Sequence, residues 1–187
     1  MIITISGLPG SGKSTMATRL SRTLGWQQHY MGRLWREMAR QKGMTLPELQ
    51  ALAETDQSID TMVDEKVKKI AQTSDNIIIE SRTAYHFVPD SFKMFFKVSP
   101  PEGARRIYND IQHSNQRNEG NHIDSVEAMV KSNEKRMATD RKRYKQYYGI
   151  DVFDEKNFDY IIDTTDLTVD EVFKKAYEAV LKELEKK

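Results

Sequence analysis

A short apolar run at the start of the chain leads directly into a glycine-rich segment. Ile2, Ile3 and Ile5 form a β-branched stretch of the kind buried in parallel sheets, and residues 7–14 read Gly-Leu-Pro-Gly-Ser-Gly-Lys-Ser. Apolar residues at helical spacing follow, so the glycine-rich segment is expected to connect a strand to a helix. In that context, the spacing Gly-x4-Gly-Lys-Ser is the complete P-loop pattern, and it predicts a nucleoside triphosphate site.

The residues of this loop suit phosphate for separate physical reasons. Its glycines leave the backbone free to turn, so that successive N–H groups point at the β-phosphate, and the helix that follows adds partial positive charge. Lys13 can bridge the β- and γ-phosphates, and the Ser14 hydroxyl can join the shell of a Mg²⁺ ion. The predicted nucleotide-binding residues are Gly7, Leu8, Pro9, Gly10, Ser11, Gly12, Lys13, Ser14 and Thr15.

Composition excludes several other classes of function. The 187-residue chain has 29 Lys+Arg against 28 Asp+Glu, so no overall charge attracts nucleic acid or an anionic membrane. The absence of cysteine excludes disulfides and thiolate sites, and the four histidines are too scattered to suggest a metal site. No apolar stretch approaches the roughly 20 residues of a membrane span, and the early P-loop strand leaves no room for a signal peptide. We expect a cytoplasmic, monomeric enzyme with no nucleic-acid or membrane partner.

Apolar strands alternate with amphipathic helices along the rest of the chain, which predicts an α/β fold with a parallel sheet. Polar residues 113–123 have little to bury and are expected to form a mobile loop. After the first strand, further strands are predicted at residues 27–30, 76–80, 92–98 and 158–162. Helices are predicted from the P-loop to Leu24, over 33–73 with breaks at Gly43 and Pro47, over 101–112, from Asp124 or Ser125 to Tyr148, and from Thr168 onward.

The arginines indicate what the chain does with a bound triphosphate. It lacks the Asn-Lys-x-Asp element of GTPases, and two bound nucleotides would need several arginines to converge on one cleft. We therefore expect a phosphoryl transferase with two moving segments that exclude water. For any single arginine a solvated surface position is an equal alternative, and Arg141 has the weakest case. The candidates are Arg36, Arg82, Arg105, Arg106, Arg136, Arg141 and Arg143.

Three segments carry a resemblance to a known family. They read Met31-Gly32-Arg33-Leu34-Trp35-Arg36, Glu80-Ser81-Arg82 and Arg136-x3-Asp140-x2-Arg143. Together they resemble the cytidylate kinases, within the nucleoside monophosphate kinase family, and most closely the compact archaeal-type branch. The resemblance extends over nearly the whole chain.

The resemblance implies the reaction ATP + CMP ⇌ ADP + CDP with Mg²⁺, and dCMP as a second acceptor. It implies that Gly32 and Arg36 shape the monophosphate site and that Arg82 grips the acceptor phosphate. It also implies that Arg136, Asp140 and Arg143 read cytosine and its phosphate. Lys13, Arg106 and Arg136 are the residues expected to stabilise charge on the phosphoryl group in transit.

The implied fold is a three-layer α/β/α P-loop core with a five-stranded parallel sheet, a helical monophosphate-binding insertion and a short lid. The expected core comprises residues 1–31, 74–112 and 149–187. The insertion is expected at 32–73, and the lid with its flanking helix at 113–148.

Several alternatives stay open at this level. Asp140 could recognise the base or could pair within its helix with Arg136 or Arg143, and Glu80 could orient Mg²⁺ through water or pair with Arg82. Acceptors other than CMP, namely AMP or UMP, are a second possibility, and a regulatory ATP-binding module is a third.

Two positions depart from the family pattern, and they bear on the choice of base. Met31 replaces a small polar residue and Ser81 replaces a glycine. Four aromatic residues could stack on a base, although packing is the favoured role for each: His29, Trp35, Tyr144 and Tyr147.

Overall fold

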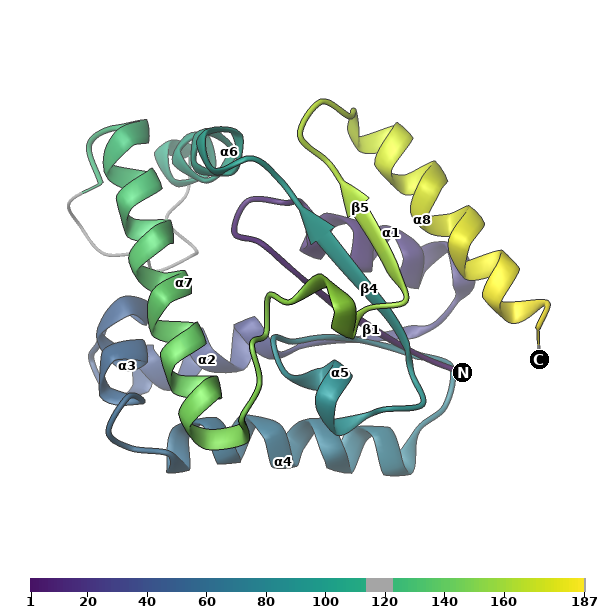
Figure 1. Ribbon diagram of the computed structural model, residues 1–187, viewed down its shortest axis with the longest axis horizontal. Coiled ribbons are helices and arrows are strands. Elements are labelled where there is room, and N and C mark those ends of the chain that lie inside the picture. The colour runs from purple at the N-terminus through teal and green to yellow at the C-terminus, as the bar shows by residue number, and fades with distance from the viewer. Residues whose placement is uncertain (114–122, 187) are drawn as a thin grey trace.

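The parallel sheet lies at the centre of the computed structural model, which describes residues 1–113 and 123–186 (Figure 1). Within those residues, every strand pairing is parallel and the strand order is β2-β3-β1-β4-β5. This arrangement confirms the predicted α/β class and the five-stranded parallel sheet. The strands are β1 (Ile2–Gly7), β2 (Gln27–Tyr30), β3 (Ile77–Glu80), β4 (Phe92–Lys97) and β5 (Tyr160–Asp163).

Four helix ends lie where the local sequence signals place them. Thr45 and Thr168 each begin a helix with a capping box, and Gly25 and Gly149 each end one in the left-handed conformation. The helices are α1 (Lys13–Leu24), α2 (Met31–Gln41), α3 (Leu46–Leu52), α4 (Ser58–Thr73), α5 (Ala84–Phe87), α6 (Pro100–His113), α7 (Val126–Tyr148) and α8 (Val169–Leu184), with a 3₁₀ turn η1 (Glu155–Asn157).

Both faces of the sheet are buried, and successive residues of a strand serve opposite faces. Ile78 of β3 packs with the apolar residues of α1 and α8, whereas Ile77 and Ile79 pack with those of α2 and α4. A third group around Phe95 of β4 packs with residues of α7 and the segment after it. The result is the predicted three-layer arrangement, with helices on either side of the sheet (Figure 1).

Some boundaries differ from the sequence-based expectation. The short helix α5 was not predicted, and residues 53–57 break the long helical stretch between α3 and α4. The last strand begins at Tyr160 rather than Phe158, because the Phe158 ring packs 4.8 Å from the Tyr85 ring and 4.7 Å from the Phe95 ring. Aromatic packing of this kind depends on residues distant in the sequence.

The helices on either side of the predicted lid are both described. α6 ends at His113, α7 begins at Val126, and the two helices lie side by side. The predicted lid falls mostly on residues 114–122, which lie outside the described residues. None of the described helices is long and apolar enough to cross a membrane.

Candidate active site

The carboxyl ends of β1 and β3 open into one cleft of about 760 Å³. Parallel α/β sheets bind ligands at this edge, because loops from several strands meet there. The cleft is continuous from the P-loop to the helices of the predicted insertion. Among the predicted site residues, its lining includes Pro9, Gly10, Ser11, Gly12, Lys13, Ser14, Thr15, Gly32, Arg36, Glu80, Arg82, Arg106, Arg136, Asp140 and Arg143.

The P-loop is held in place by a contact between two glycines. Gly10 has a φ of +76°, and a Cβ on it would lie 2.1 Å from the carbonyl oxygen of Gly103 in α6. A Cβ on Gly103 would lie 2.6 Å from the carbonyl oxygen of Pro9. The first turns of α6 can therefore approach the loop only because both residues lack side chains. Gly103 was not predicted as a site residue, since the sequence marks it only as part of the helix predicted over 101–112.

Ser14 and Glu80 form a hydrogen-bonded pair beside the P-loop. The Ser14 hydroxyl donates to Oε1 of Glu80 at 2.6 Å, while Oε2 is buried and has no hydrogen-bond partner among the described residues. Burial raises the pKa of the Glu80 carboxyl, and the nearby charge of Lys13 opposes that shift. A buried carboxylate oxygen without a donor, next to a hydroxyl and a phosphate loop, fits a magnesium ion that keeps several water ligands.

Among the described residues, no three His, Asp or Glu side chains gather into a site that could hold a metal alone. For Glu80, the structure shows a hydrogen bond with Ser14 and no ion pair with Arg82 among the described residues. Arg82 lies in a different network.

Arg36 is positioned by the turn from β2 into α2. Its guanidinium donates to the Tyr30 hydroxyl at 2.6 Å and to the Gly32 carbonyl at 3.0 Å, and its side chain is 9% exposed. A Cβ on Gly32 would lie 2.4 Å from the Tyr30 ring. Gly32 therefore gives space to the tyrosine that holds Arg36. The role of Tyr30 was missed, because it arises from a contact across the turn.

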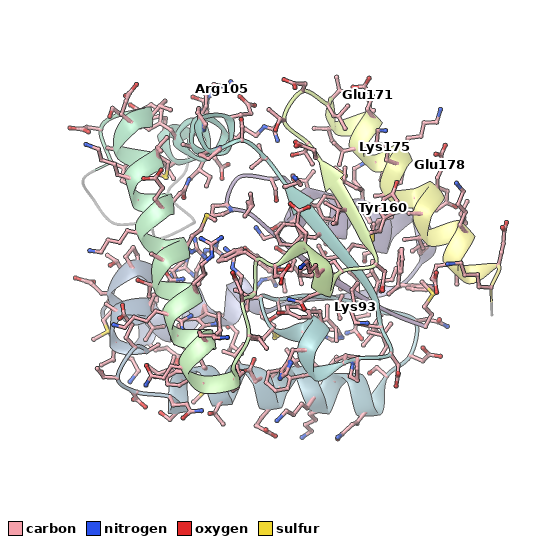
Figure 2. All side chains as sticks on the ribbon, in the orientation of Figure 1. Lys93, Arg105, Tyr160, Glu171, Lys175 and Glu178 are labelled. Atoms are coloured by element: carbon pink, nitrogen blue, oxygen red, sulfur yellow. The ribbon has the colours of Figure 1, made fainter. Side chains whose placement is uncertain are left out.

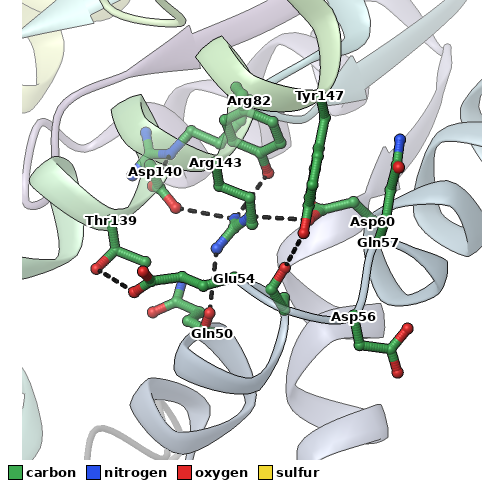
Figure 3. A network of polar contacts seen from close by, with 12 residues as sticks. Gln50, Glu54, Asp56, Gln57, Asp60, Arg82, Thr139, Asp140, Arg143 and Tyr147 are labelled. Atoms are coloured by element: carbon green, nitrogen blue, oxygen red, sulfur yellow. Dashed lines mark hydrogen bonds and ion pairs between the residues drawn. The ribbon is translucent and has the colours of Figure 1, made fainter.

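Arg82 and Arg143 converge on a buried carboxylate (Figure 3). Oδ2 of Asp140 lies 3.2 Å from Nε of Arg82, and Oδ1 lies 3.0 Å from Nη2 of Arg143. Arg82 also donates to the carbonyl of Gly7 at the end of β1. Burial lowers the pKa of Arg82, Asp140 opposes that effect, and the charge of Arg136 adds to it. Of the two readings left open for Asp140, the structure shows the ion pair with Arg143 and adds a second pair with Arg82.

Arg143 is the most deeply buried of the candidate arginines, at 1% exposure. Its Nε lies 2.8 Å from Oδ2 of Asp60 in α4, and its Nη2 donates to the Tyr144 hydroxyl at 3.1 Å. Burial raises the pKa of Asp60 to about 6, against the opposing charge of Arg143. Asp60 was not predicted as a site residue, although it lines the cleft.

The arginines of α6 face the other end of the cleft. Arg106 donates to Glu102 at 2.7 Å and to the Thr164 carbonyl at 2.8 Å, and the Thr164 hydroxyl donates to the Ser11 carbonyl at 3.2 Å. Arg106 is thus connected to the P-loop through the loop after β5. Arg105, labelled in Figure 2, is more exposed than Arg106, pairs with Glu102 and also lines the cleft.

Arg136 and Arg141 lie on different sides of α7. Arg136 lines the cleft and is close enough to affect the pKa of Arg82. Arg141 is half exposed, pairs with Asp151 at 3.4 Å and is not among the residues that line the cleft. Of the two alternatives left open for Arg141, the structure therefore supports the solvated surface position.

Of the four aromatic candidates, Trp35 and Tyr144 line the cleft, and three make contacts described here. Trp35 and Tyr144 flank the Arg143 guanidinium, with ring centroids 5.2 and 4.7 Å from its central carbon. Tyr147 donates to the carbonyl of Ala53 at 2.7 Å. His29 lies on β2, outside the cleft lining.

The two departures from the family pattern both line the cleft. Met31, the first residue of α2, is buried in the core, and the Ser81 hydroxyl lies 3.3 Å from that of Thr83. Both positions therefore border the space available to an acceptor.

Comparisons with known proteins agree with this geometry. The model of the cytidylate kinase-like family matches residues 2–166. The chain is similar to the cytidylate kinase of Methanosarcina mazei, at 38% identity over 167 residues that cover 88% of this chain and 87% of that protein. It is also similar to the cytidylate kinase of Pyrococcus furiosus, at 37% identity over 174 residues that cover 92% of this chain and 84% of that protein.

One relative carries a different description. A "S-adenosylmethionine-dependent nucleotide dehydratase" of Lacinutrix mariniflava is 32% identical over 171 residues, which cover 91% of this chain but only 34% of that protein. This chain therefore spans about a third of its length.

Solved structures support the fold. A shikimate kinase from Bacteroides thetaiotaomicron superposes with a TM-score of 0.62 and 14% identity, covering 99% of this chain and 98% of that one. An uncharacterized protein from Eubacterium ventriosum superposes with a TM-score of 0.70 and 16% identity, covering 96% of this chain and 98% of that one. Together with the family match over residues 2–166, the P-loop and the converging arginines lead to one conclusion: the chain belongs to the cytidylate kinase-like family and is a kinase.

Proposed function

We propose that this protein transfers the γ-phosphoryl group of ATP to CMP, with Mg²⁺ as cofactor and dCMP as a second acceptor. The observation that carries the proposal is the single cleft, which joins the P-loop to arginines from three other segments: Arg36, Arg82 and Arg136. A nucleotide-binding module without an acceptor would not need these arginines next to the triphosphate. Relatives named cytidylate kinases support the choice of acceptor.

The donor half of the reaction belongs to the P-loop. Its backbone N–H groups and the start of α1 bind the β-phosphate, and Lys13 neutralises charge that develops between the β- and γ-phosphates. Bound Mg²⁺, held by Ser14 and through water by Glu80, would supply further neutralisation of phosphate charge. Arg106 contributes positive charge from the side of the loop after β5.

The acceptor half requires positioning more than acid–base chemistry. A phosphate oxygen of CMP is already an anionic nucleophile, so attack in line with the leaving ADP needs no strong general base and no covalent enzyme intermediate. Arg36 and Arg82 hold that phosphate in the proposed site, and Arg136 follows charge on the moving phosphoryl group. Asp140 and Arg143 complete the proposed acceptor site. Asp140 fixes the positions of two arginines of that site, Arg82 and Arg143, by pairing with both.

The division of the chain follows from these roles. We propose a core of residues 1–31, 74–112 and 149–187, with residues 32–73 as an insertion that binds the monophosphate. In this scheme α2, α3 and α4 supply the wall opposite the P-loop, so that water is kept from the γ-phosphate until the acceptor is bound.

A coupled assay of ADP release with CMP, dCMP, UMP and AMP tests the proposal. Rapid turnover that requires CMP or dCMP supports it, and a preference for UMP or AMP would assign the site to another monophosphate. Slow ATP hydrolysis that is independent of any acceptor would favour a regulatory module. The Lys13→Ala variant controls for contaminating kinases, because its P-loop cannot support transfer.

A further inference from the structure

Tyr30 is the half-buried last residue of β2, and it lines the cleft. It lies in register with Glu80 at the end of β3, and register partners in a parallel sheet direct their side chains to the same face. On that face Glu80 accepts a hydrogen bond of 2.6 Å from Ser14, and Gln28 of β2 accepts one of 3.0 Å from Thr18 of α1. Tyr30 therefore lies on the P-loop side of the sheet, where the proposed donor and acceptor halves of the cleft meet.

The ring of Tyr30 is held in place by the start of α2. A Cβ on Gly32 would lie 2.4 Å from a carbon of the ring and 2.8 Å from its hydroxyl oxygen, so the end of the ring occupies the space that the missing side chain leaves. Nη1 of Arg36 donates to the same oxygen at 2.6 Å and to the carbonyl of Gly32 at 3.0 Å. The position of the Tyr30 hydroxyl is thus fixed by two residues of α2.

The contact with Arg36 determines how the Tyr30 hydroxyl can act. A guanidinium has N–H donors and no acceptor, so the tyrosine oxygen accepts in this contact and its own proton must be donated elsewhere. Within residues 1–113 and 123–186, the hydrogen bond from Arg36 is the only one that this hydroxyl makes. A hydroxyl that accepts from a cation is also a stronger donor, because successive hydrogen bonds polarise one another.

A phosphate oxygen is the acceptor that this arrangement suits. Both hydrogens on Nη1 of Arg36 are used by protein oxygens, so that nitrogen has none left for a ligand. The Tyr30 hydroxyl presents a donor in their place, next to a positive charge that attracts phosphate. An O–H donor and an anionic oxygen form one of the shorter and stronger hydrogen bonds found in proteins.

We propose that the Tyr30 hydroxyl donates a hydrogen bond to the phosphate of the acceptor, while Arg36 positions the hydroxyl and binds the same phosphate. The inference rests on the proposed function, since it requires a nucleoside monophosphate at this end of the cleft. It adds a second kind of phosphate donor to the acceptor site. Because every nucleoside monophosphate carries the same phosphate, Tyr30 contributes to affinity and not to the choice of base.

Tyr30→Phe tests this inference, with Tyr85→Phe as a matched control. Both variants remove a hydroxyl that is hydrogen-bonded within the protein, and Tyr85 is not among the residues that line the cleft. We expect Tyr30→Phe to lower kcat/KM for CMP at least about tenfold, as the loss of a hydrogen bond to a charged group requires, and to lower it for UMP by a similar factor. The KM for ATP should stay within about twofold of the parent, because the P-loop binds the donor. Tyr85→Phe should leave the kinetic constants unchanged.

A double-mutant cycle separates a contact with phosphate from a role that operates through Arg36 alone. Arg36→Met removes the guanidinium and keeps a side chain of similar length. If Tyr30 only positioned Arg36, adding Tyr30→Phe to Arg36→Met would not weaken the binding of CMP any further. We expect the dissociation constant for CMP, measured by calorimetry, to rise by a further factor of about three or more. No further rise would overturn the inference.

The parent enzyme separates this inference from the proposed function. A parent that phosphorylates CMP, with an unchanged kcat/KM in Tyr30→Phe, refutes the inference alone. A parent that prefers AMP refutes the proposed acceptor alone, and the variants are then compared with AMP. A parent that phosphorylates no nucleoside monophosphate refutes both. A KM for ATP that rises in Tyr30→Phe as much as kcat/KM for CMP falls would overturn the inference, because Tyr30 would then support the whole cleft.

A crystal structure of the unaltered protein with CMP covers the case in which Tyr30→Phe does not fold. The hydroxyl oxygen of Tyr30 should lie about 2.5–3.0 Å from an oxygen of the CMP phosphate. A separation of more than about 4 Å, or a hydroxyl that donates to Glu80 instead, would overturn the inference.

Discussion

The carboxylate of Asp140 joins α7 to the end of β3, because its Oδ2 lies 3.2 Å from Nε of Arg82. Both side chains are largely buried, at 2% and 14% exposure, so the pair is weakly screened by solvent. The position of an arginine proposed to grip the acceptor phosphate therefore depends on a helix that begins more than 40 residues later in the chain. In the proposed function, this dependence makes α7 part of the acceptor site.

Asp140→Ala tests the positioning role of that carboxylate. It removes one partner from two buried arginines, and we expect unfolding to become easier by about 3 kcal/mol. Asp140 positions Arg82, and we propose that Arg82 binds the phosphate that CMP and UMP share. The value of kcat/KM should therefore fall by a similar factor for both acceptors. Urea unfolding and kinetics with both acceptors measure the two effects. Glu54→Ala is the control, since Glu54 also pairs with α7, through Lys142, but is more exposed. A selective loss with CMP would show instead that Asp140 reads the base.

Lys13→Ala tests the role of the P-loop. Lys13 lies at the start of α1, lines the cleft and has no part in the apolar core. Loss of one group that stabilises developing charge should lower kcat by about a hundredfold or more. Lys68→Ala, which removes an exposed lysine paired with Glu65, should leave kcat unchanged. A kcat for Lys13→Ala within threefold of the parent would contradict the assignment, provided that circular dichroism shows a folded protein.

Gly103→Ala tests the contact between α6 and the P-loop. Its new Cβ would lie 2.6 Å from the backbone of Pro9, and backbone cannot yield as a flexible side chain can. We expect a KM for ATP raised by about tenfold and a stability loss of about 1–3 kcal/mol. Gly43→Ala is the control, because its new Cβ would have no atom within 4 Å although the φ of residue 43 is +67°. We expect its free energy of unfolding to fall by about 1 kcal/mol and its KM for ATP to stay unchanged. An unchanged KM in Gly103→Ala would show that the loop adapts to α6.

The pH dependence of stability tests the environment of Asp60. Burial raises its pKa from 3.8 to about 6, so between these values the folded protein binds more protons there than the unfolded chain. The contribution of Asp60 to stability is therefore favourable at low pH and is lost as pH rises through about 6. The charged and titratable groups that face Asp60 are Arg143, Tyr144 and Asp140 of α7 and Asp64 of α4.

Urea unfolding of the parent and Asp60→Asn at several pH values measures this contribution. Relative to Asp60→Asn, the parent should gain stability as pH falls from 7 to 4.5. A difference between the two proteins that is independent of pH would contradict the raised pKa.

The sequence predicts most of the fold because its strongest signals are local. The P-loop spacing, the capping boxes at Thr45 and Thr168, and the glycines at 25 and 149 each set a boundary by contacts within a few residues. The helix α5 and the start of β5 were not predicted, because the packing of Tyr85, Phe95 and Phe158 sets them. Those contacts join segments that are far apart in the chain.

The candidate site shows the same contrast. Arg36, Arg82 and Arg136 were predicted from their places beside strand ends and flanking helices, and all three line the cleft. Asp60 was missed because an aspartate on a helix usually faces solvent. A signal was present, however: Asp60 and Asp64 fall on the same face of α4 as the buried Val63 and Val67. Carboxylates inside an apolar stripe indicate buried partners.

The central claim is that one cleft transfers phosphate from ATP to a cytidine monophosphate. A competition reaction tests it most directly, with CMP and UMP present at equal concentrations and ATP limiting, and with the diphosphate products separated by chromatography. We expect CDP to form more than about 90% of the diphosphate made from the acceptors, as a tenfold or greater difference in kcat/KM requires. Equal amounts of CDP and UDP, or ATP consumed with no new nucleoside diphosphate other than ADP, would contradict the account.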